Sequence, residues 1–245
     1  MIQVINRALD ILEIVAANPE KPTALGEIAD TLGLNHGTCA NIMKTLVARS
    51  YLEQVGTKKG YILGAKSYAL THNDAYRKDL VDAAKSEMEK LTEITNENCL
   101  LAILNGEKRI VIHSTHAEQE LQVRTSSEKY VYDSASGRML LAMLPEPDID
   151  RFIEKYGLPN PEIWKEVDTI ENLKKQLVQF KKEECALQML AGRQVIGLAV
   201  PIQKGTKTVA SLSIYLPEYR YMLTDKTDLV YQLKMTAKRI SQHLK

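Results

Sequence analysis

The chain has 245 residues, of which 44% are hydrophobic and 26% charged, and its formal net charge is +1. This composition is typical of a soluble globular protein and excludes a disordered chain. The chain contains no run of about 18 apolar residues that would predict a membrane span. The length favours a small domain followed by a medium-sized one. Because the chain starts without a signal-peptide pattern and its three cysteines are widely spaced, we expect a cytoplasmic protein.

The first 50 residues contain three short amphipathic patterns. Apolar residues recur with helical spacing over residues 4–15, and again over residues 25–32, where Thr23 is the predicted cap. Gly33 then stands where a helix end favours positive φ. Asn35 is the predicted cap of a third helix, whose inward face is apolar. Two short helices around a glycine-containing turn predict a helix-turn-helix.

Two short strand patterns follow, at residues 51–55 and 61–63, around a basic turn bounded by glycines. Three helices followed by such a hairpin predict a winged helix. The outward face of the third helix is polar and fits the major groove, which is about 12 Å wide. Lysines at the tip of the wing suit contacts to phosphate oxygens. The predicted DNA-binding residues are Arg7, His36, Gly37, Thr38, Asn41, Lys44, Thr45, Lys58 and Lys59.

Positive charge within this first region is concentrated on the predicted DNA face. Residues 1–65 carry equal numbers of basic and acidic side chains, whereas residues 35–59 carry four basic side chains against a single acid, Glu53. Because this electrostatic signal is weak for a DNA-binding domain, the alternative is a winged helix that makes only protein contacts.

The remainder of the chain predicts a connecting helix over residues 66–82 and an α+β domain over residues 83–245. A hairpin is expected around Asn105-Gly106, followed by a third strand that includes residues 121–124. A helix over 134–144 begins with small residues, which would leave backbone N–H groups free to face an anion. Strand pairs interrupted by helices indicate an antiparallel sheet flanked by helices. The other predicted elements are a helix at 170–183, strands at 195–202 and 207–215, and a helix at 228–244.

Several segments, taken in order, resemble the IclR family of transcriptional regulators. They include Val4-Ile5-Asn6-Arg7-Ala8-Leu9-Asp10-Ile11-Leu12, Ser136-Gly137-Arg138-Met139-Leu140-Leu141-Ala142 and Ala199-Val200-Pro201-Ile202. The resemblance implies a DNA-binding winged helix over residues 1–65 and a C-terminal sensor with a GAF-like fold. The third helix departs from the family pattern, because Asn41 stands where an Arg is usual. Since Asn bonds adenine and Arg prefers guanine, we expect a changed operator base there.

The resemblance also implies where an effector binds. The corresponding positions here are Ala135, Ser136, Leu187, Gly197, Ser213 and Tyr215. Leu187 replaces a common acid, Gly197 replaces a frequent cysteine, and Tyr215 replaces a second serine. These changes predict a metal-free, more apolar pocket with Ser136, Ser213 and Tyr215 as polar anchors. The alternative is that these side chains simply pack a core.

The sequence predicts a regulator that is not an enzyme and needs no cofactor. It contains no G-x-S-x-G, P-loop or G-x-G-x-x-G motif, and His113 and His116 lack the spacing of a metal pair on a helix. We expect an allosteric repressor or activator that binds double-stranded operator DNA and a small organic acid or aromatic or apolar metabolite. It would act as a homodimer or a dimer of dimers. The competing classes are a hydrolase or transferase using Ser136 or His113, and a constitutive architectural or interaction module.

Overall fold

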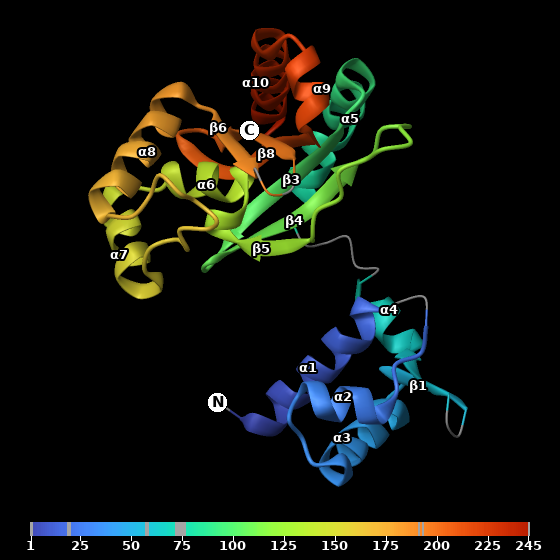
Figure 1. Ribbon diagram of the computed structural model, residues 1–245. Helices are drawn as coiled ribbons and strands as arrows, with labels where there is room; N and C mark the ends of the chain where they lie inside the picture. Colours follow the sequence, from blue (N-terminus) through green and yellow to red (C-terminus); the bar gives the residue numbers. More distant parts are fainter. Residues whose placement is uncertain are drawn as a thin grey trace. The chain divides into compact units, whose positions relative to one another are not determined.

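The chain consists of two units, Met1–Tyr76 and Arg77–Lys245, each with its own hydrophobic core. The structure is a computed structural model that describes residues 2–18, 21–56, 59–71, 77–190, 192 and 194–244. Figure 1 shows the N-terminal unit in blue to teal and the C-terminal unit in green to red. Within the described part of the chain, no helix is long and apolar enough to cross a membrane.

The N-terminal unit is a winged helix-turn-helix, as the sequence predicts. Apolar side chains of its first three helices and of β1 form its core. Gly33, directly after α2, has a φ of +59°, so the turn between α2 and α3 uses the conformation that glycine adopts without strain. The elements are α1 (Gln3–Ala17), α2 (Leu25–Thr31), α3 (His36–Ala48), the antiparallel strands β1 (Leu52–Gly56) and β2 (Gly60–Leu63), and α4 (Ala65–Thr71).

Thr23 has a different role from the predicted helix cap. The residue before α2 is Ala24, and no side chain caps this helix. Thr23 is buried and exchanges two backbone hydrogen bonds of 2.9 Å with Tyr61 on β2. The chain therefore uses this position to attach the wing to the segment between α1 and α2.

The C-terminal unit is an α+β domain with a six-stranded antiparallel sheet, in the order β5-β4-β3-β8-β7-β6. The fold class predicted from the sequence is confirmed. Its strands are β3 (Asn98–Asn105), β4 (Lys108–Thr115), β5 (Glu128–Tyr130), β6 (Ala186–Leu190), β7 (Val195–Lys204) and β8 (Lys207–Pro217). Its helices are α5 (Lys78–Thr95), α6 (Ala135–Ala142), α7 (Glu146–Tyr156), α8 (Ile170–Glu183), α9 (Glu218–Leu223) and α10 (Lys226–His243), with a 3-10 turn at Val131–Asp133.

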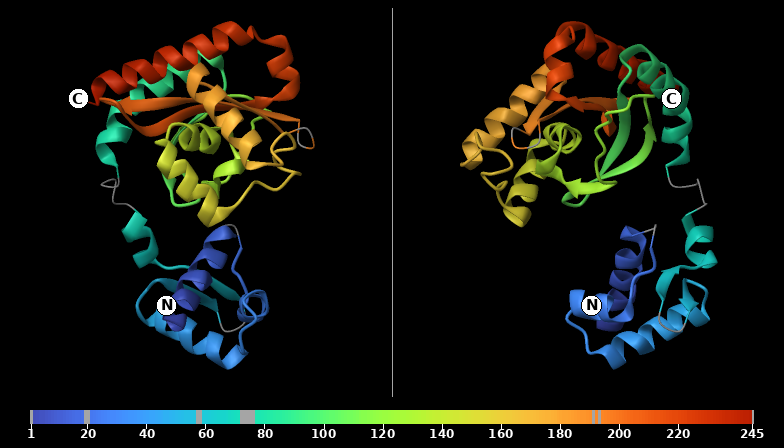
Figure 2. Two further views of the ribbon diagram at one scale, coloured as in Figure 1. Left: turned by 90° about the vertical axis from the view of Figure 1, so that its left-hand side faces the viewer. Right: turned by 45° about the vertical axis from the view of Figure 1, so that its right-hand side comes forward.

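Helices cover both faces of this sheet, as Figure 2 shows. Apolar side chains of α5 and α10 pack on one face, against alternate residues of β3, β7 and β8. The other face packs against α6, α7 and α8. Because successive residues of a strand point to opposite faces, the pairing register assigns each strand residue to the α10 face or the α6 face.

In chain order, the third strand of this sheet is β5, at residues 128–130. The prediction that residues 121–124 form this strand is wrong. Side chains bind the backbone carbonyls of this stretch: Arg220 donates to Leu121 O and Asn98 donates to Val123 O. The predicted connecting helix over 66–82 falls partly on residues outside the described ranges. The described flanks belong to α4, which ends at Thr71, and to α5, which starts at Lys78, so the connecting helix stays a prediction.

Candidate functional site

Helix α3 presents the predicted DNA-binding side chains on its exposed face. Asn35 caps the helix, and its side chain accepts a hydrogen bond of 2.8 Å from the backbone N–H of Gly37. Cys39, Ile42, Met43 and Leu46 are buried in the core. The exposed residues are His36, Gly37, Thr38, Asn41, Lys44 and Thr45. With 13 residues the helix is about 20 Å long, which suits insertion into a major groove.

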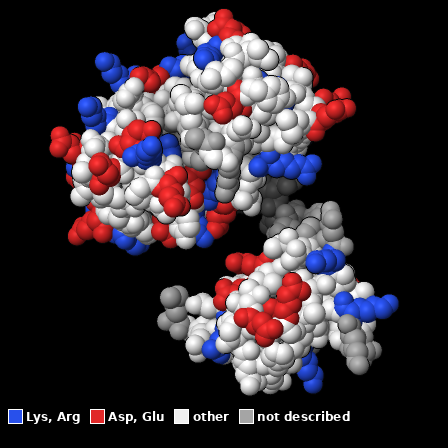
Figure 3. Space-filling model, viewed as in Figure 1, with Lys and Arg blue, Asp and Glu red and all other residues white. Residues whose placement is uncertain are grey.

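The other predicted DNA contacts lie outside α3. Lys59 is exposed at the end of the wing, beside the start of β2, whereas Lys58 lies outside the described residues. Arg7 is half-buried on α1. In Figure 3 the acidic side chains of this unit gather on the face that α1 and α2 form, where Asp10, Glu13, Glu27 and Asp30 are exposed. Helix α3 itself carries no acid, although Asp30 of α2 lies 3.4 Å from the His36 ring at its start. An approaching polyanion would meet basic and polar side chains along most of this face.

The start of α6 is closed by the chain's own side chains. The N–H of Ala135 donates to Gln188 Oε1 at 3.1 Å, and the N–H of Ser136 donates to the Tyr215 hydroxyl at 3.5 Å. The N–H of Gly137 donates to the Ser134 hydroxyl at 3.1 Å. The prediction that these N–H groups are free to face an anion is therefore wrong.

Tyr215 fills the space where the sequence predicts an effector pocket. The register places Tyr215 beside Gly197, and a Cβ added at Gly197 would lie 2.7 Å from the Tyr215 ring. The Tyr215 hydroxyl lies 3.3 Å from the Ser136 hydroxyl. Ala135, Ser136 and Ser213 are fully buried, and Tyr215 is 3% exposed. Five of the six predicted effector residues thus come together, but as packed side chains around a tyrosine.

The sixth predicted effector residue, Leu187, lies on the other face of the sheet. Leu187 pairs with Leu198, which packs toward α10, whereas Gln188 pairs with Gly197 and is buried toward α6. The residue of β6 that faces the predicted effector pocket is Gln188, one position after the predicted Leu187. Hydrophobicity gives no signal for it, because the apolar Leu187 is partly exposed and the polar Gln188 is 1% exposed.

An open cavity of about 650 Å³ adjoins this packed centre. Val195 and Pro217, the next pair along β7 and β8 on the α6 face, form part of its wall. The rest of the wall comes from two segments absent from the prediction, the loop at 121–124 and the region of α9. The full lining is Leu121, Gln122, Val123, Arg124, Gln194, Val195, Pro217, Glu218, Tyr219 and Met222.

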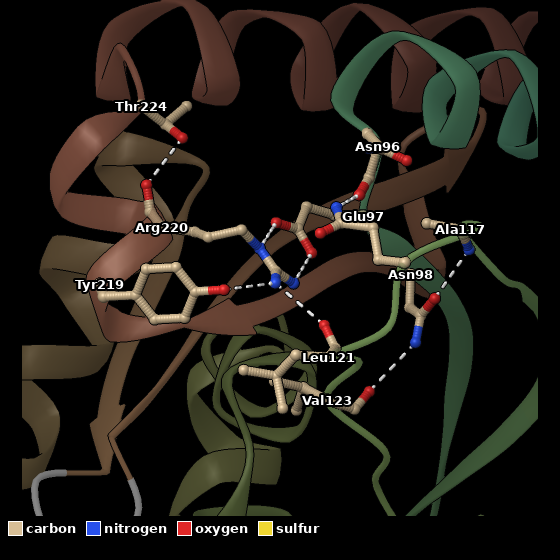
Figure 4. A network of polar contacts seen from close by, with 10 residues as sticks. Asn96, Glu97, Asn98, Ala117, Leu121, Val123, Tyr219, Arg220 and Thr224 are labelled. Atoms are coloured by element: carbon tan, nitrogen blue, oxygen red, sulfur yellow. Dashed lines mark hydrogen bonds and ion pairs between the residues drawn. The ribbon is translucent and has the colours of Figure 1, made fainter.

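A buried polar network fixes one wall of this cavity, as Figure 4 shows. Glu97 accepts hydrogen bonds of 2.6 and 2.8 Å from Arg220, which also donates to Leu121 O at 2.9 Å. Asn98 donates to Val123 O at 3.2 Å and accepts from the N–H of Ala117 at 2.9 Å. These bonds attach the loop and α9 to the start of β3. Because the Arg220–Glu97 pair is bidentate and buried, it holds this wall rigidly.

Ser136 and His113, the two residues that an enzyme would use, lie on opposite faces of the sheet. His113 pairs with Leu101, which packs toward α5 and α10, whereas Ser136 starts α6. Burial is the main reason that the pKa of His113 lies below its ordinary value. His116 is exposed and its ring bonds Ser114. Within the described ranges, no three His, Cys, Asp or Glu side chains are grouped to hold a metal ion.

Comparison with known proteins gives consistent matches along the chain. Residues 4–56 match the IclR helix-turn-helix domain, and residues 72–242 match the bacterial transcriptional regulator IclR C-terminal domain. KdgR of Dickeya chrysanthemi, an HTH-type transcriptional regulator, is 22% identical over 234 residues, which cover 94% of this chain and 76% of KdgR. BhcR of Paracoccus denitrificans is 29% identical over 163 residues, or 64% of this chain, and the match spans just over half of BhcR (56%).

Solved structures share the fold. An IclR homologue from Microbacterium hydrocarbonoxydans, complexed with 4-hydroxybenzoate, superposes with a TM-score of 0.80 at 20% identity and covers 99% of each chain. An IclR transcriptional regulator from Alicyclobacillus acidocaldarius gives a TM-score of 0.79 at 21% identity and covers 100% of each. The chain belongs to the IclR family of bacterial transcriptional regulators, with a helix-turn-helix DNA-binding domain and a C-terminal effector-binding domain.

Proposed function

We propose that this protein binds a specific operator as a homodimer and that a small organic molecule in the C-terminal unit changes its operator affinity. The observation that carries the proposal is the charge separation within the winged helix. Acids are exposed on α1 and α2, while α3 exposes basic and polar side chains and carries no acid of its own. Such a protein works where the DNA is, in the bacterial cytoplasm.

Helix α3 would enter the major groove. Asn41 and Lys44 are exposed near its middle and would reach base edges, with His36, Gly37, Thr38 and Thr45 alongside them. Asn41 would bond N6 and N7 of an adenine. Lys59, together with Lys58 and Arg7, would contact phosphate oxygens, which fix the position of the protein on DNA without reading sequence.

A second copy of the chain would complete the DNA-binding unit. One winged helix reads too few bases for genomic specificity, so two would bind a palindromic or repeated site. Helix α1 exposes an apolar surface that fits this role, since Val4, Ile5 and Leu9 are each more than half exposed. Burying such side chains between two copies is favourable by about 25 cal/mol per Å². Two such dimers would associate further on longer operators.

The effector would be an organic acid or an aromatic or apolar metabolite. The homologue from Microbacterium hydrocarbonoxydans is complexed with 4-hydroxybenzoate, and the cavity beside Tyr215 has room for a molecule of that size. Ala135, Ser136, Gly197 and Ser213 would line the inner end of the site once Tyr215 moves, while Gln188 takes the place predicted for Leu187. A ligand shifts DNA affinity only by its differential affinity for two states of the protein.

The experiment is a selection from random duplex DNA with the full chain. We expect enrichment of a site with two related half-sites about one helical turn, or a multiple of it, apart. A thermal-shift screen of metabolites would then identify compounds that stabilise the chain. If no sequence is enriched and binding depends on salt alone, the protein is not a sequence-specific regulator.

A further inference from the structure

Arg109 on β4 is a fully buried cation without a counter-ion. Its side chain is 0% exposed, and it forms no ion pair with any residue that the structure describes. The guanidinium donates to Ser126 O at 3.0 Å and, more weakly, to Ser127 O and the Thr125 hydroxyl at 3.5 and 3.4 Å. Its Nε has no hydrogen-bond partner. Burial lowers the pKa of Arg109, as expected for a charge removed from water.

The other arginines of this unit with low exposure are compensated. Arg220 is held by both oxygens of Glu97, and Arg239 pairs with Glu87. Arg138 stacks on the Trp164 ring at 3.9 Å and donates to two backbone carbonyls. An uncompensated buried charge costs several kcal/mol. Arg109 differs from these three, because it has neither a counter-ion nor an aromatic ring among the described residues and its Nε is left without a partner.

A second unpartnered group lies on the same face of the sheet. Ser211 on β8 is fully buried, and its hydroxyl has no partner. Arg109 on β4 pairs with Leu104 on β3. Two residues earlier on β3, Ala102 pairs with Val111 on β4 and, on its other side, with Ser211 on β8. Arg109 and Ser211 thus lie on either side of β3 and on the same face of the sheet, with the small side chain of Ala102 beside Ser211. The Nε of Arg109 and the hydroxyl of Ser211 are two buried polar atoms without a partner, which indicates a missing acceptor.

The open cavity and Arg109 share one loop. Residues 121–124 line the cavity, and the next three residues hold the Arg109 guanidinium. Tyr215 lies on the same face of the sheet as Arg109, as the register of β3 with β4 and β8 shows. Tyr215 also pairs with Gly197, one step inward from the cavity wall. A ligand entering from the cavity would therefore pass Tyr215 before it reaches Arg109.

We propose that Arg109 is the anion-recognition residue of the effector site and that it binds the carboxylate of a small monoanionic organic acid above Ala102, with Ser211 donating to the same group. The inference rests on the proposed effector binding and adds the residue that selects a charged ligand. A carboxylate only accepts hydrogen bonds, as both orphan groups require. Its single charge neutralises one guanidinium, whereas a dianion would leave a net charge buried.

The test compares carboxylates with their neutral amides on the full chain. Acetate and benzoate should raise the melting temperature with concentration, while acetamide and benzamide should not. Arg109→Met should weaken the carboxylate response about 30-fold or more, and Ser211→Ala should weaken it less. Arg151→Met is the control, because Arg151 is exposed on α7 and does not line the cavity; it should keep the full response. Arg124→Met tests the cavity wall instead. If Arg109→Met does not fold, Arg109→Lys replaces it and should bind the carboxylates more weakly than the wild type.

Three results would overturn the proposal: equal responses to carboxylates and amides, no response to either carboxylate, or a full response in Arg109→Met. The first two would mean that no carboxylate binds at Arg109. Loss of the response in Arg124→Met would assign the anion to the cavity rim instead. Operator binding is measured in parallel. If Arg109→Met binds the operator but ignores carboxylates, the inference holds; if the wild type binds no operator, the proposed function fails independently.

Discussion

At the scale of single residues, Tyr215 occupies the place where the sequence predicts an effector. Its ring lies against Gly197, and its hydroxyl accepts from the N–H of Ser136. With Gln188 it occupies the positive end of α6, the position that an anionic ligand would otherwise take. The chain thus carries an internal substitute for a ligand, and any effector that binds there must displace a tyrosine.

Removing only the hydroxyl tests this arrangement. Tyr215→Phe should lower the free energy of unfolding by about 1–2 kcal/mol, because the buried N–H of Ser136 loses its acceptor. Urea denaturation of the full chain measures the change. Tyr231→Phe, at a tyrosine that is 56% exposed, is the control and should be neutral. An unchanged stability of Tyr215→Phe would show that the hydroxyl is not bonded in solution.

Asn41 is the residue for which the operator preference is predicted. Asn41→Ala should weaken binding to the selected operator by about 1–3 kcal/mol and relax the preference at one base pair per half-site. Lys59→Ala should weaken binding to all sequences equally and reduce the salt dependence by about one phosphate contact. Fluorescence anisotropy on matched and mutated duplexes separates the two effects. If Asn41→Ala keeps the full base preference, another residue reads that position.

At the scale of elements, helix α5 is attached to α10 by a charged cluster at Glu87. Glu87 is 5% exposed and contacts both Lys90 on its own helix and Arg239 on α10. A hydrogen bond from Lys90 holds the pKa of Glu87 below its ordinary value; burial opposes this, and Arg239 adds to the lowering. The folded state thus favours the ionised carboxylate of Glu87. The contacts of Glu87 therefore stabilise the unit at pH values above the pKa of Glu in the unfolded chain, which is about 4.3.

The resulting pH dependence has a definite sign. As the pH falls below about 4.3 and through the lower folded pKa, Glu87 becomes protonated and its stabilisation is lost. Glu87→Gln should therefore be less stable than the wild type at pH 7, and the difference should shrink toward pH 3. Thermal unfolding at a series of pH values measures it, with the exposed Glu89→Gln as the control. A constant difference across this range would contradict the assignment.

Elements with a regular apolar period could be predicted from the sequence, and those set by distant side chains could not. The helix at Ile170–Glu183 and the cap at Ser134 follow local rules. Residues 121–124 alternate as a strand would, but Arg220, almost one hundred residues later, binds their backbone. The sequence did not identify Arg109 and Gln188 as buried residues. Strands usually bury apolar side chains and expose polar ones, whereas these two polar side chains lie on the buried face.

At the scale of the whole molecule, the function that we propose requires a second copy. Ile5→Glu on the exposed apolar face of α1 should weaken dimerisation, because burying an unpaired carboxylate is costly. Glu13→Gln, exposed on the same helix, is the control. Analytical ultracentrifugation over a range of concentrations gives the dissociation constants. A dimer unaffected by Ile5→Glu would mean that copies associate through another surface.

Two units in one chain amount to a regulator only if ligand binding in one changes DNA binding by the other. A coupling of about 1–3 kcal/mol is typical and corresponds to about 5–150-fold in affinity. The most direct measurement is the dissociation constant of the full chain for its selected operator, with and without a saturating compound that stabilises the C-terminal unit. We predict a change within that range, in either direction. An unchanged dissociation constant, with the compound demonstrably bound, would contradict effector-controlled DNA binding.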